Sequence, residues 1–464
     1  MKQDNATPLS GTAETRELSG VEKLVWMITR RVPLNFAVVA RIRGEFSTDD
    51  LRSAAALVRT QYKGLASRIA RNEQGALCYT GDDVPDFPVT ELAIDTDDAW
   101  RREVERELAE PFEGWVGPLA RFVVLRHRDY VDLLVVCDHG VADGLSAVNL
   151  LRDVCRRMVE LDAPVVDLPR PQSAAALIPP EVRQQREVIA LLRWGPKALW
   201  LLSKLDRCIR FFTRKAPPSI EPYAEFPRPE DLRGVIEKQG VRLTTWFLPH
   251  EQLKSLVDRC RAEQTTVHAA LCVAWARAAY DLDPKGKGAK RIIESPINIR
   301  PRLKPAPEEG AGLYNLLANV NADARLDFWQ AAREFRRGLD KATTDTKLLS
   351  GVLFIEHQVA KNDETELRRM VAWLENTKSK HCMSISNLGR VRMPTDFGPF
   401  QIEQVHGPCV IGRGGVPVIG VATHNDRLTF SLTEDCSAID LATSQATIRT
   451  AMRHLAEACG WQVT

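Results

Sequence analysis

Two proline-rich stretches constrain the fold of this chain more than any other feature of its sequence. Residues 162–180 and residues 216–229 each contain five prolines. Proline lacks a backbone N–H and fixes φ, so prolines at this density do not fit inside helices or central strands and indicate extended connectors. Because a domain takes about 100–200 residues, we expect an N-terminal half, 1–165, a linker, 166–229, and a C-terminal half, 230–464.

In the N-terminal half, the spacing of apolar residues changes repeatedly between that of a helix and that of a strand. Ser47 is expected to cap a helix, because Asp50 stands three residues further on and apolar residues follow at helical spacing. Two apolar runs separated by a short polar turn indicate a hairpin of buried strands. The predicted elements are helices at 18–29, 47–62 and 145–161 and strands at 36–42, 121–125 and 131–137.

The C-terminal half repeats this alternation. Residues 424–426 are expected to form the turn of a late hairpin. The predicted elements are strands at 241–247, 291–299, 383–386, 416–423 and 428–432 and helices at 249–263, 266–280, 327–339, 364–375 and 442–458. Strands and helices alternate in both halves, so the sequence predicts an α/β protein with two α/β sandwich-like domains of similar construction.

Composition excludes several functional classes. Lys and Arg number 63 and Asp and Glu 61, for a formal net charge of +2, whereas a dedicated nucleic-acid binder has a clearly basic domain. The ten cysteines are scattered without a CxxC pair, so we expect free thiols and no metal site. The first 20 residues are polar, and no apolar run of about 18–20 residues occurs. We therefore expect a cytoplasmic protein.

The most specific local signal is the HxxxDG motif formed by His139, Asp143 and Gly144 at the end of an apolar strand. An imidazole at the edge of a sheet can project into a crevice and accept a proton near neutral pH. Gly144 would allow a substrate to approach the backbone. The same pattern also fits a structural histidine and an ordinary helix N-cap at Asp143, so the motif alone leaves both interpretations open.

Four further segments, taken with the motif, resemble a known superfamily. Together with HxxxDG, residues 18–22 (LSGVE), 297–303 (INIRPRL), 386–391 (SNLGRV) and 396–398 (DFG) resemble the acyltransferases related to chloramphenicol acetyltransferase. These include peptide condensation domains and plant BAHD acyltransferases. The groups that the chain resembles most are the stand-alone polyketide-associated (phthiocerol dimycocerosyl) transferases and the wax ester synthases. Here 396–400 reads DFGPF where plant members carry DFGWG. This departure makes a plant-type member doubtful and assigns Asp396 to a turn.

The resemblance implies a V-shaped pair of domains, a pseudo-dimer with a tunnel between its halves. By position, His139 would be the general base. Asp143 would be structural, paired with Arg300, and Gly144 would lie beside it. We also expect four further residues to line the substrate tunnel, namely Asp138, Ser386, Asn387 and Gly389.

The activity implied is transfer of an acyl group from a thioester to an alcohol. The donor would be acyl-CoA or the phosphopantetheine thioester of an acyl carrier protein, and the acceptor a small-molecule or lipid alcohol. No tightly bound cofactor or metal is needed. Amide-forming condensation domains commonly read HHxxxDG, and Asp138 in place of the first histidine favours ester formation. The alternatives are an amide-forming enzyme of the same fold and a non-catalytic binding protein.

Residues 181–215 combine tryptophans and leucines with nine basic residues. A basic amphipathic helix can lie on an anionic membrane or bind an acidic carrier protein. It can equally be a crossover helix that packs its apolar side on the two domains, which is the interpretation we favour. Gly195 and Pro196 are expected to break or kink this helix. We expect a monomer without a nucleic-acid partner.

Overall fold

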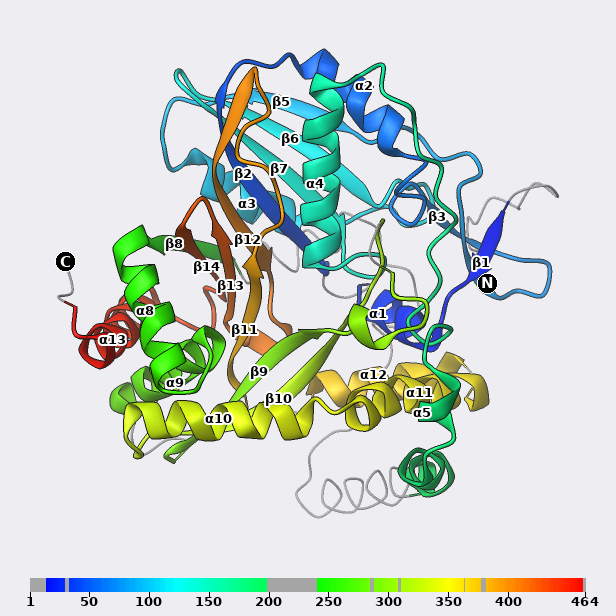
Figure 1. Cartoon of the computed structure of the whole chain (residues 1–464). Coiled ribbons are helices and arrows are strands. Elements are labelled where there is room, and N and C mark those ends of the chain that lie inside the picture. The colour runs from blue at the N-terminus through cyan, green and yellow to red at the C-terminus, as the bar shows by residue number, and fades with distance from the viewer. Residues whose placement is uncertain are drawn as a thin grey trace.

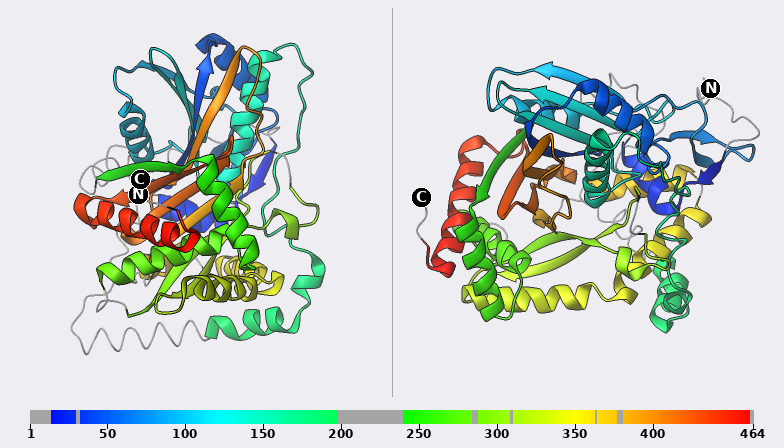
Figure 2. Two further views of the ribbon diagram at one scale, coloured as in Figure 1. Left: turned by 60° about the vertical axis from the view of Figure 1, so that its left-hand side comes forward. Right: turned by 45° about the horizontal axis from the view of Figure 1, so that its top comes forward.

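The computed structural model shows two mixed α/β halves side by side, each built on its own β-sheet (Figure 1). Helices cover the outer surfaces, and the connector after α4 runs down one side of the molecule from the first half to the second (Figures 1 and 2). The structure describes residues 14–29, 33–197, 240–283, 288–307, 310–362, 364–376 and 381–461.

The first half contains a five-stranded sheet that is buried on both faces. Its strand order is β12-β2-β7-β6-β5. The strands are β2 (Asn35–Gly44), β5 (Val89–Ala93), β6 (Ala120–Arg126), β7 (Val131–Asp138) and β12 (Phe400–Val410), and the helices are α2 (Thr48–Val58), α3 (Ala99–Ala109) and α4 (Gly144–Val159).

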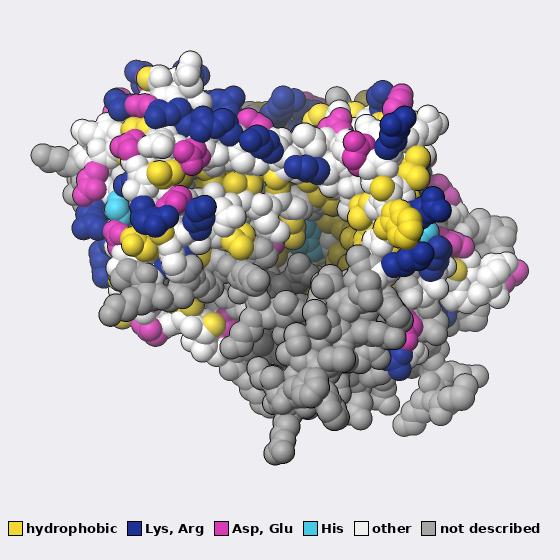
Figure 3. All heavy atoms as spheres, turned by 90° about the horizontal axis from the view of Figure 1, so that it is seen from below, with side chains coloured by type: hydrophobic (Ala, Val, Ile, Leu, Met, Phe, Trp, Pro, Cys, Tyr) yellow, Lys and Arg dark blue, Asp and Glu magenta, His cyan; other side chains and the backbone are white. Residues whose placement is uncertain are grey.

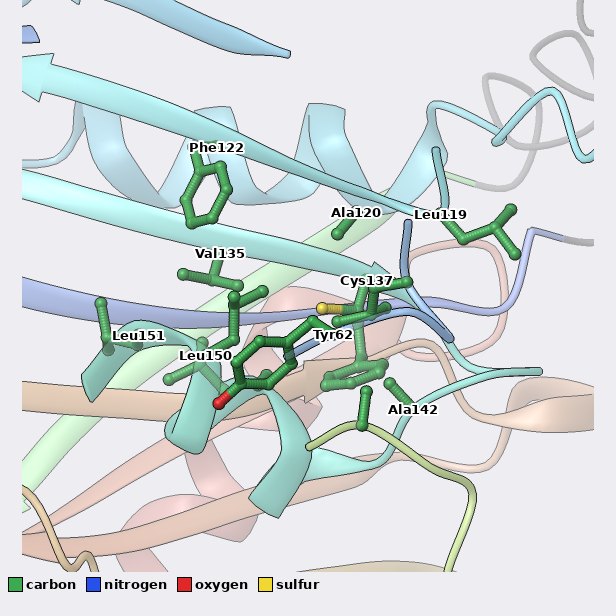
Figure 4. Close-up of a cluster of buried hydrophobic side chains, with 14 of the residues drawn as sticks. Tyr62, Leu119, Ala120, Phe122, Val135, Cys137, Ala142, Leu150 and Leu151 are labelled. Carbon is green, nitrogen blue, oxygen red and sulfur yellow. The ribbon is translucent and has the colours of Figure 1, made fainter. Parts of the chain in front are cut away.

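Alternate residues of the central strands point to opposite faces of this sheet. Phe122, Val135 and Cys137 face Leu150 and Leu151 of α4 in the close-up of Figure 4, and they share one buried cluster with residues of α2. Val123 and Val136 pack instead with α3. Because both faces are covered, the strands are continuous apolar runs rather than alternating ones.

The second half contains a six-stranded sheet of order β10-β9-β11-β13-β14-β8. Strand β11 runs parallel to both neighbours, while the other pairs are antiparallel. One face packs against four helices around the buried Trp275. The strands are β8 (Val241–Leu248), β9 (Lys290–Asn298), β10 (Asn315–Asp323), β11 (His381–Arg390), β13 (Val418–His424) and β14 (Arg427–Asp435), and the four helices are α8 (His250–Ala262), α9 (Val267–Leu282), α10 (Phe328–Ala342) and α13 (Leu441–Cys459).

Smaller elements complete the structure at the junction of the two halves. A three-stranded sheet of order β1-β4-β3 consists of β1 (Thr15–Glu17), β3 (Arg68–Arg71) and β4 (Leu77–Thr80). The remaining α-helices with assigned bounds are α1 (Gly20–Thr29), α5 (Pro180–Arg183), α11 (Asp345–Lys361) and α12 (Glu364–Asn376), and short 3-10 turns lie at Arg300–Arg302 and Arg413–Gly415.

Strand β12 joins the two halves directly. It comes from the C-terminal part of the sequence but pairs antiparallel with β2 in the first sheet, with Val405 opposite Ala40. Residues 400–410 therefore extend the N-terminal sheet, which a division of the chain at residue 230 does not anticipate.

Most of the elements expected from the sequence are present. Ser47 caps α2 by accepting a hydrogen bond from the Asp50 N–H at 2.9 Å, and β6 and β7 form the predicted hairpin. The turn after β13 is also confirmed, with Asn425 and Asp426 at positive φ. The elements that the sequence did not indicate include α3, α11, β10 and β12.

A break at Gly195 and Pro196 is wrong, because residues 186–197 are one continuous helix, whereas a kink there stays a prediction. The other part of the predicted linker helix, 198–215, and the second proline-rich stretch lie outside the described residues. In the described part, all nine cysteines are free thiols. No helix among those residues is long and apolar enough to span a membrane.

Two glycines give a matched test of how tightly β12 packs against the second sheet. A Cβ at Gly420 would lie 2.2 Å from the Pro408 carbonyl oxygen, whereas a Cβ at Gly351, in α11, meets nothing within 4 Å. Gly420→Ala is therefore expected to lower the free energy of unfolding by about 1–3 kcal/mol. Gly351→Ala should raise it by about 0.5–1 kcal/mol. Denaturant unfolding of both variants checks this, and equal effects would contradict the packing described.

Candidate active site

The motif histidine stands at the point where strand β7 ends. Asp138, the last residue of β7, turns the chain by accepting a hydrogen bond from the Gly140 N–H on Oδ1 at 2.7 Å. The His139 N–H donates to the Leu34 carbonyl at 2.9 Å, which ties the turn to the residue before β2. The backbone of His139 is therefore fixed from both sides.

The His139 ring has one bonded nitrogen and one free nitrogen. Nδ1 lies 2.9 Å from the Ala142 carbonyl oxygen, and because a carbonyl only accepts, Nδ1 carries the proton. The ring also contacts Phe36, with centroids 4.9 Å apart. No hydrogen bond from a described residue to Nε2 is present, and His139 is partly exposed as a residue. Burial lowers the pKa of His139, partly offset by the Ala142 hydrogen bond. The imidazole is thus neutral near pH 7, with its lone pair on Nε2.

Asp143 caps helix α4 and is buried, with 2% of its surface exposed. Its carboxylate accepts hydrogen bonds from the Ser146 N–H at 3.0 Å and from the Tyr314 N–H at 3.1 Å. The guanidinium of Arg300 donates to both oxygens, at 2.7 and 2.9 Å. Burial by itself would raise the pKa of Asp143, but the Arg300 charge and these hydrogen bonds outweigh burial and lower it. The carboxylate is held ionised, and the predicted Arg300 partner is present.

This ion pair connects the two halves of the molecule. Arg300 follows β9 in the second half, and its guanidinium also donates to Ser146 Oγ at 2.9 Å and lies 4.9 Å from the centre of the Tyr314 ring. Ser146 Oγ in turn accepts from the Gly312 N–H at 3.1 Å. The carboxylate is therefore fully engaged by protein groups and has no free oxygen lone pair for a substrate.

Gly144 lies beside the ion pair in a tightly packed position. A Cβ at this position would lie 2.9 Å from the Leu388 side chain and 3.4 Å from Pro408. The missing side chain thus makes room for β11 and β12, and the approach of a substrate to Gly144 stays a prediction. Leu388 lies between the predicted tunnel residues Asn387 and Gly389, so this part of β11 packs directly against the motif.

Of the predicted tunnel residues, Asn387 and Gly389 shape the backbone of β11. Asn387 Oδ1 accepts from the Gly389 N–H at 2.8 Å, Gly389 has φ of +69°, and the pairing of β11 with β13 shifts register here. Ser386 is partly exposed and pairs with Gly420. The structure therefore places these residues on the segment next to Gly144, and their contact with a substrate stays a prediction.

Asp138 differs from the other carboxylates of this region. Burial raises its pKa to about 6, although the Gly140 N–H and the Arg121 charge act in the opposite direction. Its hydrogen bond shapes the turn that carries His139, which is a structural contribution that the sequence pattern did not reveal. A tunnel-lining role for Asp138 stays a prediction.

A small pocket lies behind the motif turn, where Val141 and Tyr314 form part of its wall beside the Arg16–Glu22 ion pair. Figure 3 shows a separate hollow, seen from below, whose walls are mainly hydrophobic and in which a histidine side chain is visible.

Two further residues, Asp396 and His268, have structural surroundings. Asp396 is exposed and accepts from the Gly398 N–H at 2.8 Å, as expected for a turn residue. His268 Nε2 lies 2.9 Å from the buried Ser295 Oγ, and burial lowers the pKa of His268 to about 4. Within the described ranges, no group of three or more His, Cys, Asp or Glu side chains is arranged to hold a metal ion.

Comparison with solved structures identifies the fold. Polyketide synthase associated protein 5 from Mycobacterium tuberculosis is similar with a TM-score of 0.61 and 15% identity, over 96% of this chain and 99% of that one. A trichothecene 15-O-acetyltransferase from Fusarium sporotrichioides gives a TM-score of 0.66 and 12% identity, over 99% and 97% of the chains. The first condensation domain of the calcium-dependent antibiotic synthetase gives 0.62 and 14%, over 96% of each.

These similarities show that the protein has the two-domain fold of the condensation-domain and chloramphenicol-acetyltransferase-like superfamily, as the sequence predicted. They extend over nearly the whole chain, at sequence identities that establish the fold alone. No protein-family model and no curated protein sequence matches the chain.

Removing one member of the buried ion pair is expected to destabilise the protein strongly. Arg300→Met leaves the Asp143 carboxylate buried without its counter-charge, which should cost about 3–5 kcal/mol in unfolding free energy, and Asp143→Ala should likewise reduce the yield of folded protein. The matched control is Arg302→Met, whose guanidinium pairs with the more exposed Asp345 and should cost less than about 1 kcal/mol. Denaturant unfolding distinguishes them, and similar losses in both variants would contradict the assignment.

The raised pKa of Asp138 makes a prediction about pH. An acid with a higher pKa in the folded state favours folding when protonated, so the stability that it contributes decreases as pH rises from about 3.8 to about 6. Asp138→Asn keeps an acceptor for the Gly140 N–H but cannot ionise. Its melting temperature relative to wild type should therefore increase through this window. Asp396→Asn, the same change in an exposed turn, is the control, and an equal pH trend in both would refute the prediction.

Proposed function

We propose that this protein is an acyltransferase that transfers an acyl group from a thioester to an alcohol, with His139 as the general base. The observation that carries the proposal is the His139 ring. Its Nδ1–H is held by the Ala142 carbonyl, its Nε2 has no hydrogen-bond partner among the described residues, and the residue is partly exposed. A base needs this tautomer and an unoccupied nitrogen. The similarity of the fold to acyltransferases and condensation domains supports the same assignment.

In the proposed reaction, His139 transfers one proton from the acceptor hydroxyl to the leaving thiolate. Nε2 removes the hydroxyl proton of the acceptor while that oxygen attacks the thioester carbonyl, which forms the new C–O bond. When the tetrahedral intermediate collapses, the C–S bond breaks and the Nε2 proton passes to the departing thiolate. The Nδ1–H bond to Ala142 stabilises the imidazolium formed between these steps. Such a base contributes about 10²–10⁴-fold to the rate.

The neighbouring Asp143 supports this base indirectly. Its carboxylate is occupied by Arg300 and by the N–H groups of Ser146 and Tyr314, so it does not exchange protons with the substrate. Instead it fixes the start of α4, and the Ala142 carbonyl that orients the imidazole directly precedes it in the chain. Asp143 is thus a positioning residue in the proposed mechanism.

The donor in this proposal is acyl-CoA or an acyl-carrier-protein thioester, and the acceptor is a small-molecule or lipid alcohol. A thioester is already activated, so the residues near His139 need only position the substrates and move a proton. Condensation domains are among the proteins of similar fold, which supports the carrier-protein thioester as a donor.

An amide-forming condensation reaction is the alternative, because an amine can replace the alcohol at the same base. The Asp138 carboxylate precedes His139 and accepts the Gly140 N–H, whereas HHxxxDG is common in amide-forming domains. Mass spectrometry of products from a panel of acyl-CoAs with alcohols and amines offered together distinguishes the two. Ester products support the proposal, and exclusive amide products refute the choice of acceptor.

Replacing the proposed base should reduce the rate without unfolding the protein. His139→Ala is expected to lower kcat/KM by about 10²–10⁴-fold, while its melting curve stays close to that of wild type. The control is His250→Ala on α8, whose side chain is 55% exposed and which should keep full activity. Unchanged turnover by the His139 variant would overturn the mechanism.

The lowered pKa of His139 also predicts the pH profile. The base must be neutral to act, so kcat/KM should rise with pH through the pKa of His139, which burial places below 6.5. The rise of kcat/KM with pH should therefore be complete before pH 7. A limb that is still rising above pH 7 would show that a different group is the base.

A further inference from the structure

The helix formed by residues 186–197 lies at the lower edge of the molecule, below α5 and α11 (Figure 1). Its inner face is attached to the second half. Val188 is fully buried, and Leu192 packs against the cluster that includes residues of α11. Gly195 lies so close to Phe354 of α11 that a Cβ would be 2.7 Å from the Phe354 ring. The helix is therefore held firmly in one orientation.

The outer face of this helix carries a line of cations. Three basic side chains are exposed, those of Arg186, Arg193 and Lys197. Arg193 lies seven residues and Lys197 eleven residues after Arg186. Because seven and eleven residues are close to two and three helical turns of 3.6 residues, the three side chains project on one side. None of them forms an ion pair with a described residue. We call these three residues the basic face.

Two large apolar side chains flank the basic face. Trp194 is 55% exposed, the highest value among the exposed large hydrophobic residues of the described part. Ile189 is 52% exposed, a value that Val166 also has. Arg193 and Lys197 lie over the Trp194 ring, at 5.3 and 4.6 Å from its centre. Ile189 and Trp194 are therefore exposed beside cations that form no ion pair with a described residue.

The composition of this face matches the surface of a membrane with anionic lipids. Lysine and arginine are attracted to negative headgroups, and tryptophan prefers the boundary between headgroups and acyl chains. The hydrophobic hollow in Figure 3 opens on the same underside of the molecule, where hydrophobic side chains lie beside Lys and Arg. An apolar substrate leaving a membrane would therefore meet this side of the protein.

We propose that helix 186–197 binds the surface of anionic membranes, with the basic face at the headgroups and with Ile189 and Trp194 in the interfacial layer. An acidic partner protein would pair with the three cations, but it would need a separate apolar surface to contact Ile189 and Trp194. A lipid surface accommodates both kinds of group over the whole width of the face.

The test is sedimentation of the full-length protein with vesicles of phosphatidylcholine, alone or mixed with phosphatidylglycerol. Wild type should partition onto the anionic vesicles only, and added salt should weaken binding. Arg193→Gln with Lys197→Gln should lower the partition coefficient about 25-fold, because each basic residue contributes about five-fold. Trp194→Ala should lower it as well.

The control changes the same charges elsewhere. Lys254→Gln with Arg261→Gln on α8 removes two cations that are 65% and 77% exposed, and it should bind anionic vesicles as wild type does. Equal binding by the helix variant and wild type overturns the proposal, and so does wild type that binds neither vesicle. Retention by an acidic carrier protein without vesicle binding overturns it in favour of a protein partner. Melting curves confirm that each variant is folded.

Discussion

The buried ion pair between Asp143 and Arg300 is the interaction on which the rest of the site depends. A carboxylate this deeply buried stays charged only because a guanidinium and several N–H groups from both halves converge on it. That convergence fixes the start of α4 and, through the adjacent Ala142 carbonyl, the orientation of the His139 ring. The stability of the contact between the halves and the readiness of the imidazole thus have a common physical origin.

The parts of the fold that the sequence predicted correctly are those whose signals are local. The apolar run of β7 and the Ser47 cap of α2 depend on neighbouring residues and appear where expected. Helix α3 escaped notice because it buries Glu103 and Glu107, which pair with arginines and interrupt the apolar pattern. Strand β12 escaped notice because its partner β2 lies about 360 residues away in the chain, and no local pattern records such a pairing.

The same distinction applies to the candidate site. The sequence identified the charged and ionisable members, His139, Asp143 and Arg300, because a motif and a resemblance mark them. It missed the Tyr314 N–H and the Leu388 side chain, since a backbone donor has no residue signature and a leucine in a strand is ordinary. Only the folded chain shows that Leu388 occupies the space that the missing side chain of Gly144 leaves.

The pairing of β12 with β2 has a consequence for how this protein is made. On the ribosome, the first half emerges long before residues 400–410 are synthesised, so β2 waits with one edge unpaired until almost the whole polypeptide has left the exit tunnel. Completion of the first sheet is therefore one of the last events of biogenesis. A nascent chain that stops before β12 lacks the strand that pairs with β2 and completes the first sheet.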